Sequence, residues 1–345
     1  MSAVFVRGIG AVSPAGWGVE ALRQALNQNS ALSLRELPCP GHARPLQARG
    51  VPALASRPPF AAHPRMRRTS PIGQYAVSAA LEALGSKTAT PGATSGRERL
   101  GIVYCAMSGC VNFSRRFYDE TLKDPATASP VIFPETVFNA PASHLAALLG
   151  TPAINYTLIG DSGTFLQGIA LAADWLLDDR VEGCLVVGAE ELDWLVAQAF
   201  ELFDPLGAVA EGAAALFLSR EAAAAGSVTL EAISQAHLFF NQRQRIEAAR
   251  KAREEIRTGQ EPADSLLCDG AQGVARLDRA ENQAWHDWTG ARLSPKRICG
   301  EAFAAAAAWQ CVAAVDALSQ SRFSTATVSV VGCNQQAIAA RFSRK

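Results

Sequence analysis

The sequence predicts an α/β fold built of layered sheets and helices. Short β-branched runs alternate with helical stretches along the chain, and this pattern restarts near Ala222. Such alternation is typical of α/β domains. We therefore expect two strand–helix halves of similar composition, residues 1–221 and 222–345, in an internally duplicated fold. The direct repeat signal between the halves is weak.

The elements of the first half follow from hydrophobic periodicity and from Gly and Pro stops. Strands are expected in the stretches 3–16 (followed there by a loop), 100–107, 153–160, 183–191 and 212–220. Helices are expected at 18–28, 70–85, 110–122, 142–150 and 164–179. The stretch Leu37–Arg68 is rich in Pro, Ala and Arg and is expected to be irregular.

The second half repeats the alternation with different lengths. Strands are expected at 227–234, 265–271 and 326–333, the last of these as the final strand. Helices are expected at 242–259, 278–290 and 302–319. The first of these helices mixes charges at helical spacing, which indicates a solvated face, with docking of an acidic carrier protein as the alternative.

Composition bounds the class of protein. The 345 residues are 49% hydrophobic, and Lys+Arg and Asp+Glu both count 32, so the net charge is zero. A balanced charge argues against nucleic-acid binding and against a membrane-surface role, and the apolar fraction suggests surface covered by a partner. The start of the chain does not resemble a signal peptide, and no apolar stretch reaches membrane-spanning length.

The cysteines predict no metal site. The eight cysteines are scattered without a CxxC pair, and several lie in apolar runs. This pattern indicates free buried thiols in a reducing cytoplasm. We expect a cytoplasmic protein with no metal and no other cofactor.

The stretch LIGDSGTFLQG, residues 158–168, holds the first candidate for chemistry. It predicts a strand, a tight turn with Ser162 at its tip, and a helix behind it. A hydroxyl at such a turn is a common way to present a nucleophile, and the glycines on either side permit the turn. The residues alone leave two interpretations: a reactive serine, or a small residue at a vestigial position.

Several stretches together resemble one family. They are VFVRGIGAVSPAGWGVEAL, VIFPETVFNAPASHLAALLG, INYTLIGDSGTFLQGIALAADWLLDDRVEGCLVVGAEE, FDPLGAVAEGAAALFLSR, DGAQGVARLDRAENQAW and SPKRICGEAFAAAAAWQ. In this order they resemble segments of the β-ketoacyl synthases, the condensing enzymes of the thiolase fold. The resemblance covers nearly the whole chain. It implies a duplicated five-layer α-β-α-β-α architecture.

The resemblance also implies that the condensing residues are lost. The family's reactive Cys falls on Ser162, its first His on Asp269 and its second His on Glu301, while Lys296 matches the family's Lys. Thiolate and imidazoles are what the condensation requires, and carboxylates near a developing enolate would destabilise it. The glycine-rich loop near the C-terminus is also reduced, to SVVGCN, which keeps Gly332 and Asn334.

Losses of this kind resemble the chain length factors of type II polyketide synthases and the related subunits of aryl polyene systems. The resemblance implies a heterodimer with an active ketosynthase, and an acyl chain carried on the phosphopantetheine arm of an acyl carrier protein. Those subunits usually carry Gln at the nucleophile position, so Ser162 is a departure from the subgroup pattern.

The expected function is therefore a ketosynthase-like subunit that does not condense acyl units itself and shapes the tunnel for a polyketide or fatty-acid-like chain. The alternatives are an acyltransferase or hydrolase that uses Ser162 with Asp269 or Glu301 as base, and a homodimeric scaffold without chemistry. In the non-catalytic interpretation, both carboxylates belong to a satisfied polar network, with Lys296 as the partner of Glu301.

The helix expected at 110–122 carries a second set of candidates. Cys110, Phe113 and Phe117 share one apolar face, which most simply indicates core packing. The family resemblance implies instead that this helix lies at a subunit interface and lines the tunnel end. Phe138 is a weaker candidate of the same kind.

Overall fold

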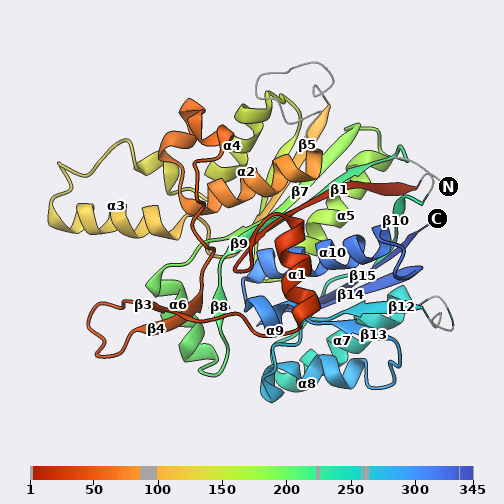
Figure 1. Cartoon of the computed structure of the whole chain (residues 1–345). Helices are drawn as coiled ribbons and strands as arrows, with labels where there is room; N and C mark the ends of the chain where they lie inside the picture. The colour runs from red at the N-terminus through yellow and green to blue at the C-terminus, as the bar shows by residue number, and fades with distance from the viewer. Residues whose placement is uncertain are drawn as a thin grey trace.

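The computed structural model describes residues 3–85, 99–222, 226–257, 259, 264–333 and 335–344. Within these residues, a twelve-stranded mixed sheet dominates the fold (Figure 1). Its main path runs β13-β12-β14-β15-β10-β1-β9-β7-β5-β6. Two short strands pair beside this path, β2 (Gly16–Trp17) with β1 and β11 (His237–Leu238) with β15.

The main path contains two sets of five strands. The first set is β1 (Val4–Ser13), β5 (Leu100–Ala106), β6 (Asn155–Ile159), β7 (Gly183–Glu190) and β9 (Gly212–Ser219). The second set is β10 (Val228–Ile233), β12 (Ser265–Cys268), β13 (Ala291–Leu293), β14 (Thr325–Val331) and β15 (Gln336–Arg344).

Both sets have the same topology. The first strand of each set pairs antiparallel with the fifth, and the fifth with the fourth. The second strand of each set is parallel to both the third and the fourth. The sets join where β1 pairs antiparallel with β10, with Val4 opposite Leu230. A duplicated topology is what the sequence predicted, while the domain bounds 1–221 and 222–345 stay a prediction.

Helices cover both sets and separate them, which gives five layers (Figure 1). The helices α2 (Pro71–Leu84) and α4 (Ala140–Leu149) pack on the outer face of the first set. The helices α7 (Gln242–Ile256) and α8 (Ala275–Ala284) pack on the outer face of the second. Between the sets lie α5 (Thr164–Leu177) and α10 (Phe303–Ser319). The predicted helix–sheet–helix–sheet–helix layering is thus confirmed.

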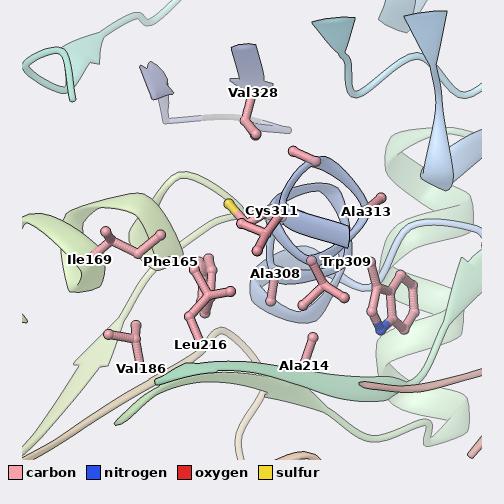
Figure 2. Close-up of a cluster of buried hydrophobic side chains, with 14 of the residues drawn as sticks. Phe165, Ile169, Val186, Ala214, Leu216, Ala308, Trp309, Cys311, Ala313 and Val328 are labelled. Carbon is pink, nitrogen blue, oxygen red and sulfur yellow. The ribbon is translucent and has the colours of Figure 1, made fainter. Parts of the chain in front are cut away.

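The central layer is held by α10, which is buried from Phe303 to Leu318. A helix that is apolar on all sides belongs inside a protein, and its alanines let two sheets approach closely. Figure 2 shows side chains of this helix against α5 and against strands of both sets. The indole of Trp309 donates to the carbonyls of Val12 and Ala213, at 3.0 and 3.2 Å.

A smaller three-stranded sheet lies beside the main one. It is made by β3 (Arg35–Leu37), β4 (Leu46–Arg49) and β8 (Val209–Ala210), and α6 (Trp194–Phe203) packs on β4. The sequence did not predict these strands or this helix. Part of the stretch predicted as irregular therefore has regular structure, including the 3-10 helices η1 (Pro59–Ala62) and η2 (Pro64–Arg68).

Two further predictions are corrected. The stretch 326–333 is not the final strand, because β15 follows it as a central strand of the sheet. The segment Gln336–Arg344 contains only one β-branched residue, Ile338, so its composition gave little signal. The remaining elements are α1 (Val19–Gln28), α3 (Val111–Lys123), α9 (Pro295–Cys299) and the 3-10 helix η3 (Phe133–Glu135).

Candidate functional site

The predicted elbow is present. Ser162 lies in the turn between β6 and α5, and its side chain is fully buried. Gly160 is required in this turn, because a Cβ there would lie 2.3 Å from the hydroxyl oxygen of Thr164. Ser162 is thus held where a nucleophile would be presented, but it does not face solvent.

A buried polar cluster surrounds the Ser162 hydroxyl. Ser162 Oγ donates to Glu301 Oε1 at 3.3 Å, and Lys296 Nζ donates to Ser162 Oγ at 3.4 Å. Lys296 Nζ also forms an ion pair with Glu301 Oε2 at 2.8 Å. The exposed fractions are 1% for Lys296 and 0% for Glu301. The predicted pairing of Lys296 with Glu301 is confirmed.

The charge state of Lys296 decides what this cluster can do. Burial lowers the pKa of Lys296, but the surrounding acidic groups, Glu301 foremost, together raise it by more, so the pKa lies above its ordinary value. The ammonium therefore stays protonated near neutral pH. A protonated Lys296 cannot take the proton of Ser162, so it does not activate the hydroxyl as a base.

Glu301 is also saturated with donors. Besides the serine and the lysine, it accepts the side-chain amide of Gln272 at 3.0 Å and the backbone N–H of Phe303 at 2.8 Å. Four donors around one buried carboxylate satisfy its oxygens. This arrangement is the satisfied polar network that the non-catalytic interpretation predicted.

Gln272 was missed by the sequence analysis. We expected Asp269 to reach this cluster, but the residue of that loop that contacts Glu301 is Gln272, three positions later. In the described residues, Asp269 makes no hydrogen bond with Ser162, Lys296 or Glu301. The loop after β12 carries both side chains, and spacing from a motif could not tell which one points inward.

Asp269 belongs to a neighbouring network. Its Oδ1 accepts from Ser294 Oγ at 2.6 Å, and its Oδ2 lies 3.6 Å from Arg292 Nη1. Burial raises the pKa of Asp269. Behind it, burial and the Asp269 charge raise the pKa of Glu281 to about 8. Glu281 Oε2 accepts the backbone N–H of Gly270 at 2.9 Å.

The reduced C-terminal loop closes over the elbow. Asp161 accepts the backbone N–H of Gln335 at 3.2 Å and the side-chain amide of Gln336 at 3.1 Å. A Cβ at Gly332 would lie 1.8 Å from Asp161 Oδ2, so this close approach requires glycine. Asn334, which the sequence analysis noted in this loop, lies outside the described residues. Asp161 thus fastens the loop rather than facing Ser162.

Phe303 begins α10 in an unusual conformation. Its φ of 44° is in the left-handed region, which costs a residue with a Cβ on the order of 1–3 kcal/mol. The bond from its N–H to Glu301 and its edge-on ring contact with Phe200, 6.0 Å between centroids, hold it there. No sequence signal indicated this feature.

The second set of candidates lies on a projecting arm. Helix α3 extends away from the body (Figure 1), and none of its residues is fully buried. The simple interpretation as core packing holds for Cys110, which is buried in a core cluster, but Phe113 and Phe117 are only partly buried. Phe113 is half-buried, and Phe117 packs against Phe133 at 5.3 Å between ring centroids.

The other two candidates lie at the base of this arm. Cys110 occupies the N-cap position of α3, without a side-chain capping bond, and is buried. Phe138 lies over Gly109 with an exposed fraction of 43%. Their role in a tunnel or an interface stays a prediction.

The arm also presents an apolar surface that the sequence analysis did not identify. Its exposed members are Tyr118, Leu122, Val131, Phe133, Val137 and Phe138. Within the first strand set, β6 forms the end of the main sheet, and its residues Tyr156 and Ile159 are about half exposed. We call these two features the arm and the β6 edge.

The described residues contain no group of three or more His, Cys, Asp or Glu that could hold a metal ion. The eight cysteines are free and buried, as predicted. Among the described residues, no histidine hydrogen-bonds to Ser162, Lys296 or Glu301; His144, for example, pairs with Glu135 at 2.6 Å. Within the described chain, no helix is both long and apolar enough to cross a membrane.

Solved structures with the same architecture identify the fold. The ishigamide ketosynthase/chain length factor matches with a TM-score of 0.82 at 18% identity, over 99% of each chain. A ketosynthase in complex with its chain length factor from Xenorhabdus doucetiae matches with a TM-score of 0.76 at 15% identity, over 100% of this chain and 98% of that one.

A third match is a type II PKS acyl-carrier protein in complex with its ketosynthase bound to the hexaketide. Its TM-score is 0.76 at 17% identity, over 100% of this chain and 99% of that one. No family model matches the sequence, and no curated protein matches it. The chain thus has the thiolase-like fold of ketosynthases and chain length factors, as the sequence predicted.

Proposed function

We propose that this chain is a non-condensing, ketosynthase-like subunit that pairs with an active β-ketoacyl synthase and acts as a chain length factor. One observation carries the proposal: the position of the nucleophile holds a buried Ser162 hydrogen-bonded within a closed Lys296–Glu301 ion pair. No imidazole lies there among the described residues, and the carboxylate would oppose an enolate rather than stabilise it.

Two surface features, the β6 edge and the arm, support binding of a partner protein. The β6 edge leaves the outer backbone groups of β6 without a neighbouring strand among the described residues, and such an edge readily pairs with another chain. The arm adds a group of exposed apolar side chains, and exposed apolar patches of this kind mark surfaces that a partner covers. Together they suit a large interface with a ketosynthase of the same fold, and the Phe113–Phe117 face would lie near that interface.

A basic segment supports a carrier protein as the second partner. Between Glu36 and Glu82 the sequence has six arginines and no acidic residue. Arg57, Arg65, Arg67 and Arg68 are exposed around η1 and η2. A cluster of guanidinium groups favours an acidic partner, which suits the acyl carrier protein better than the mixed charges of α7 do.

The function is tested by co-expression with the intact ketosynthase encoded nearest to this chain. We expect one heterodimer on size exclusion, and acyl mass only on the ketosynthase after incubation with malonyl- and acyl-carrier thioesters. An acyl mass on this chain that disappears in Ser162→Ala would establish a serine enzyme instead. A stable homodimer that ignores the ketosynthase would favour the scaffold alternative.

The interface is tested by charge insertion on the arm. Leu122→Asp and Phe133→Asp each place a carboxylate on an exposed apolar position, with exposed fractions of 67% and 56%. We expect both variants to fold and to weaken association with the ketosynthase at least about tenfold, because a carboxylate buried at an interface loses its hydration.

The matched control for the arm is Leu238→Asp, on β11, which pairs with β15 beside the second strand set, with an exposed fraction of 61%. Association should be unchanged in this control. Unchanged association in both arm variants would show that the arm does not form the interface. Fluorescence anisotropy with labelled ketosynthase measures the association of all three variants.

A further inference from the structure

A polar cavity of ≈ 530 Å³ lies on the outer side of the loop after β12. Its walls come from separate parts of the chain: the end of α1, the loop 269–273, α8, the β13–α9 connection and the turn after α10. This volume lies within the range of about 300–1,000 Å³ that is typical of small-molecule sites. It is distinct from the Ser162 cluster, which the same loop meets on its inner side through Gln272.

The carboxylates that line the cavity already accept hydrogen bonds from donors of the protein itself. Asp278 accepts the backbone N–H groups of Gln272 and Gly273, at 2.8 and 2.9 Å. Asp269 accepts from Ser294 Oγ and from the backbone N–H of Ala271, at 2.6 and 3.2 Å. Arg292 faces Asp269 at 3.6 Å and donates to the carbonyl of Trp285. These groups do not need a ligand.

The cations at the mouth of the cavity, in contrast, are exposed to solvent and are not paired with any described residue of the protein. Arg297 and Arg322 line it, and in the described residues neither guanidinium donates to a protein acceptor. The guanidinium of Arg322 lies over the ring of Phe323, 5.8 Å from its centroid. Asn27 and Asn29, at the end of α1, and Asn282 of α8 line the same cavity. The uncommitted groups of the cavity are therefore mainly donors, with more than one positive charge.

We infer that this cavity binds the phosphate group of a small phosphomonoester. A guanidinium offers a planar pair of N–H donors that matches phosphate oxygens, and two such groups match a dianion better than a monocarboxylate. The volume leaves room for the organic part of the molecule beyond the phosphate. The inference does not depend on the proposed chain length function, because it involves neither the partner nor Ser162.

Isothermal titration calorimetry of the full chain tests the site, with phenyl phosphate, inorganic phosphate and benzoate as probes. We expect phenyl phosphate to bind with one-to-one stoichiometry, inorganic phosphate more weakly and benzoate at least about tenfold more weakly than phenyl phosphate. Benzoate binding as tight as phenyl phosphate, or no binding of phenyl phosphate at millimolar concentration, would overturn the inference.

Matched charge-removing variants locate the site. Arg297→Gln and Arg322→Gln should each weaken phenyl phosphate binding about tenfold or more, and Arg322→Lys should weaken it less. The control is Arg250→Gln, an exposed arginine of α7 outside the cavity, which should leave binding unchanged. Equal weakening in the control would mean that net charge alone attracts the probe. Binding unaffected by both cavity variants would place the probe elsewhere.

Discussion

Replacing Lys296 by Met is expected to lower the free energy of unfolding by about 3–5 kcal/mol. The substitution keeps most of the length of the side chain but leaves Glu301 as an unpaired, fully buried carboxylate. Desolvation of an unpaired charge is costly, whereas removing both charges together costs much less. The double variant Lys296→Met/Glu301→Gln is therefore expected to be more stable than Lys296→Met alone, because the amide oxygen that replaces the carboxylate can still accept the N–H of Phe303.

Urea unfolding of the four proteins of this double-mutant cycle gives the coupling free energy directly. The control is Lys251→Met, an exposed residue of α7 paired with Glu247 at 3.2 Å. Exposed pairs of this kind contribute little, so the control should change stability by less than about 1 kcal/mol. If Lys296→Met and the control lowered the free energy of unfolding by similar amounts, Lys296 and Glu301 would not form the buried ion pair described above.

The free energy of unfolding is expected to fall as the pH rises from about 4.5 to about 8, with Glu281 as the main source. Burial, reinforced by the charge of Asp269, raises the pKa of Glu281 to about 8, from an ordinary value of 4.5. Between these values the native state retains a proton that the unfolded chain has released. The contribution of Glu281 is therefore fully present below about pH 4.5 and is lost as the pH passes 8.

Glu281→Gln should remove most of this pH dependence, because an amide stays neutral throughout. The change in slope corresponds to a difference on the order of 4 kcal/mol between pH 5 and pH 9. Glu254→Gln, at an exposed position of α7, is the matched control and should leave the slope as in the wild type. Parallel stability–pH curves for wild type and Glu281→Gln would contradict the assignment. Glu190, whose pKa burial raises to about 7, would then be the next group to substitute.

Local composition was enough to predict the layered α/β class, most of the elements and the place of the elbow. An apolar helix such as α10 can only lie inside, and Gly160 before Ser162 marks a tight turn. The ion pair of Lys296 with Glu301 was also predictable, because Glu301 follows Lys296 by five positions and a buried carboxylate needs a partner.

The side chains that meet across long separations could be identified only in the folded chain. Whether Asp269 or Gln272 faces Glu301 depends on how the loop after β12 packs, and both residues are compatible with the spacing. The exposure of the arm could not be predicted, because an apolar helical face has the same sequence pattern whether it packs on the protein's own core or stays at the surface. The central strand β15 was missed for a related reason: its stability comes from pairing with β14 and β10 rather than from its own β-propensity.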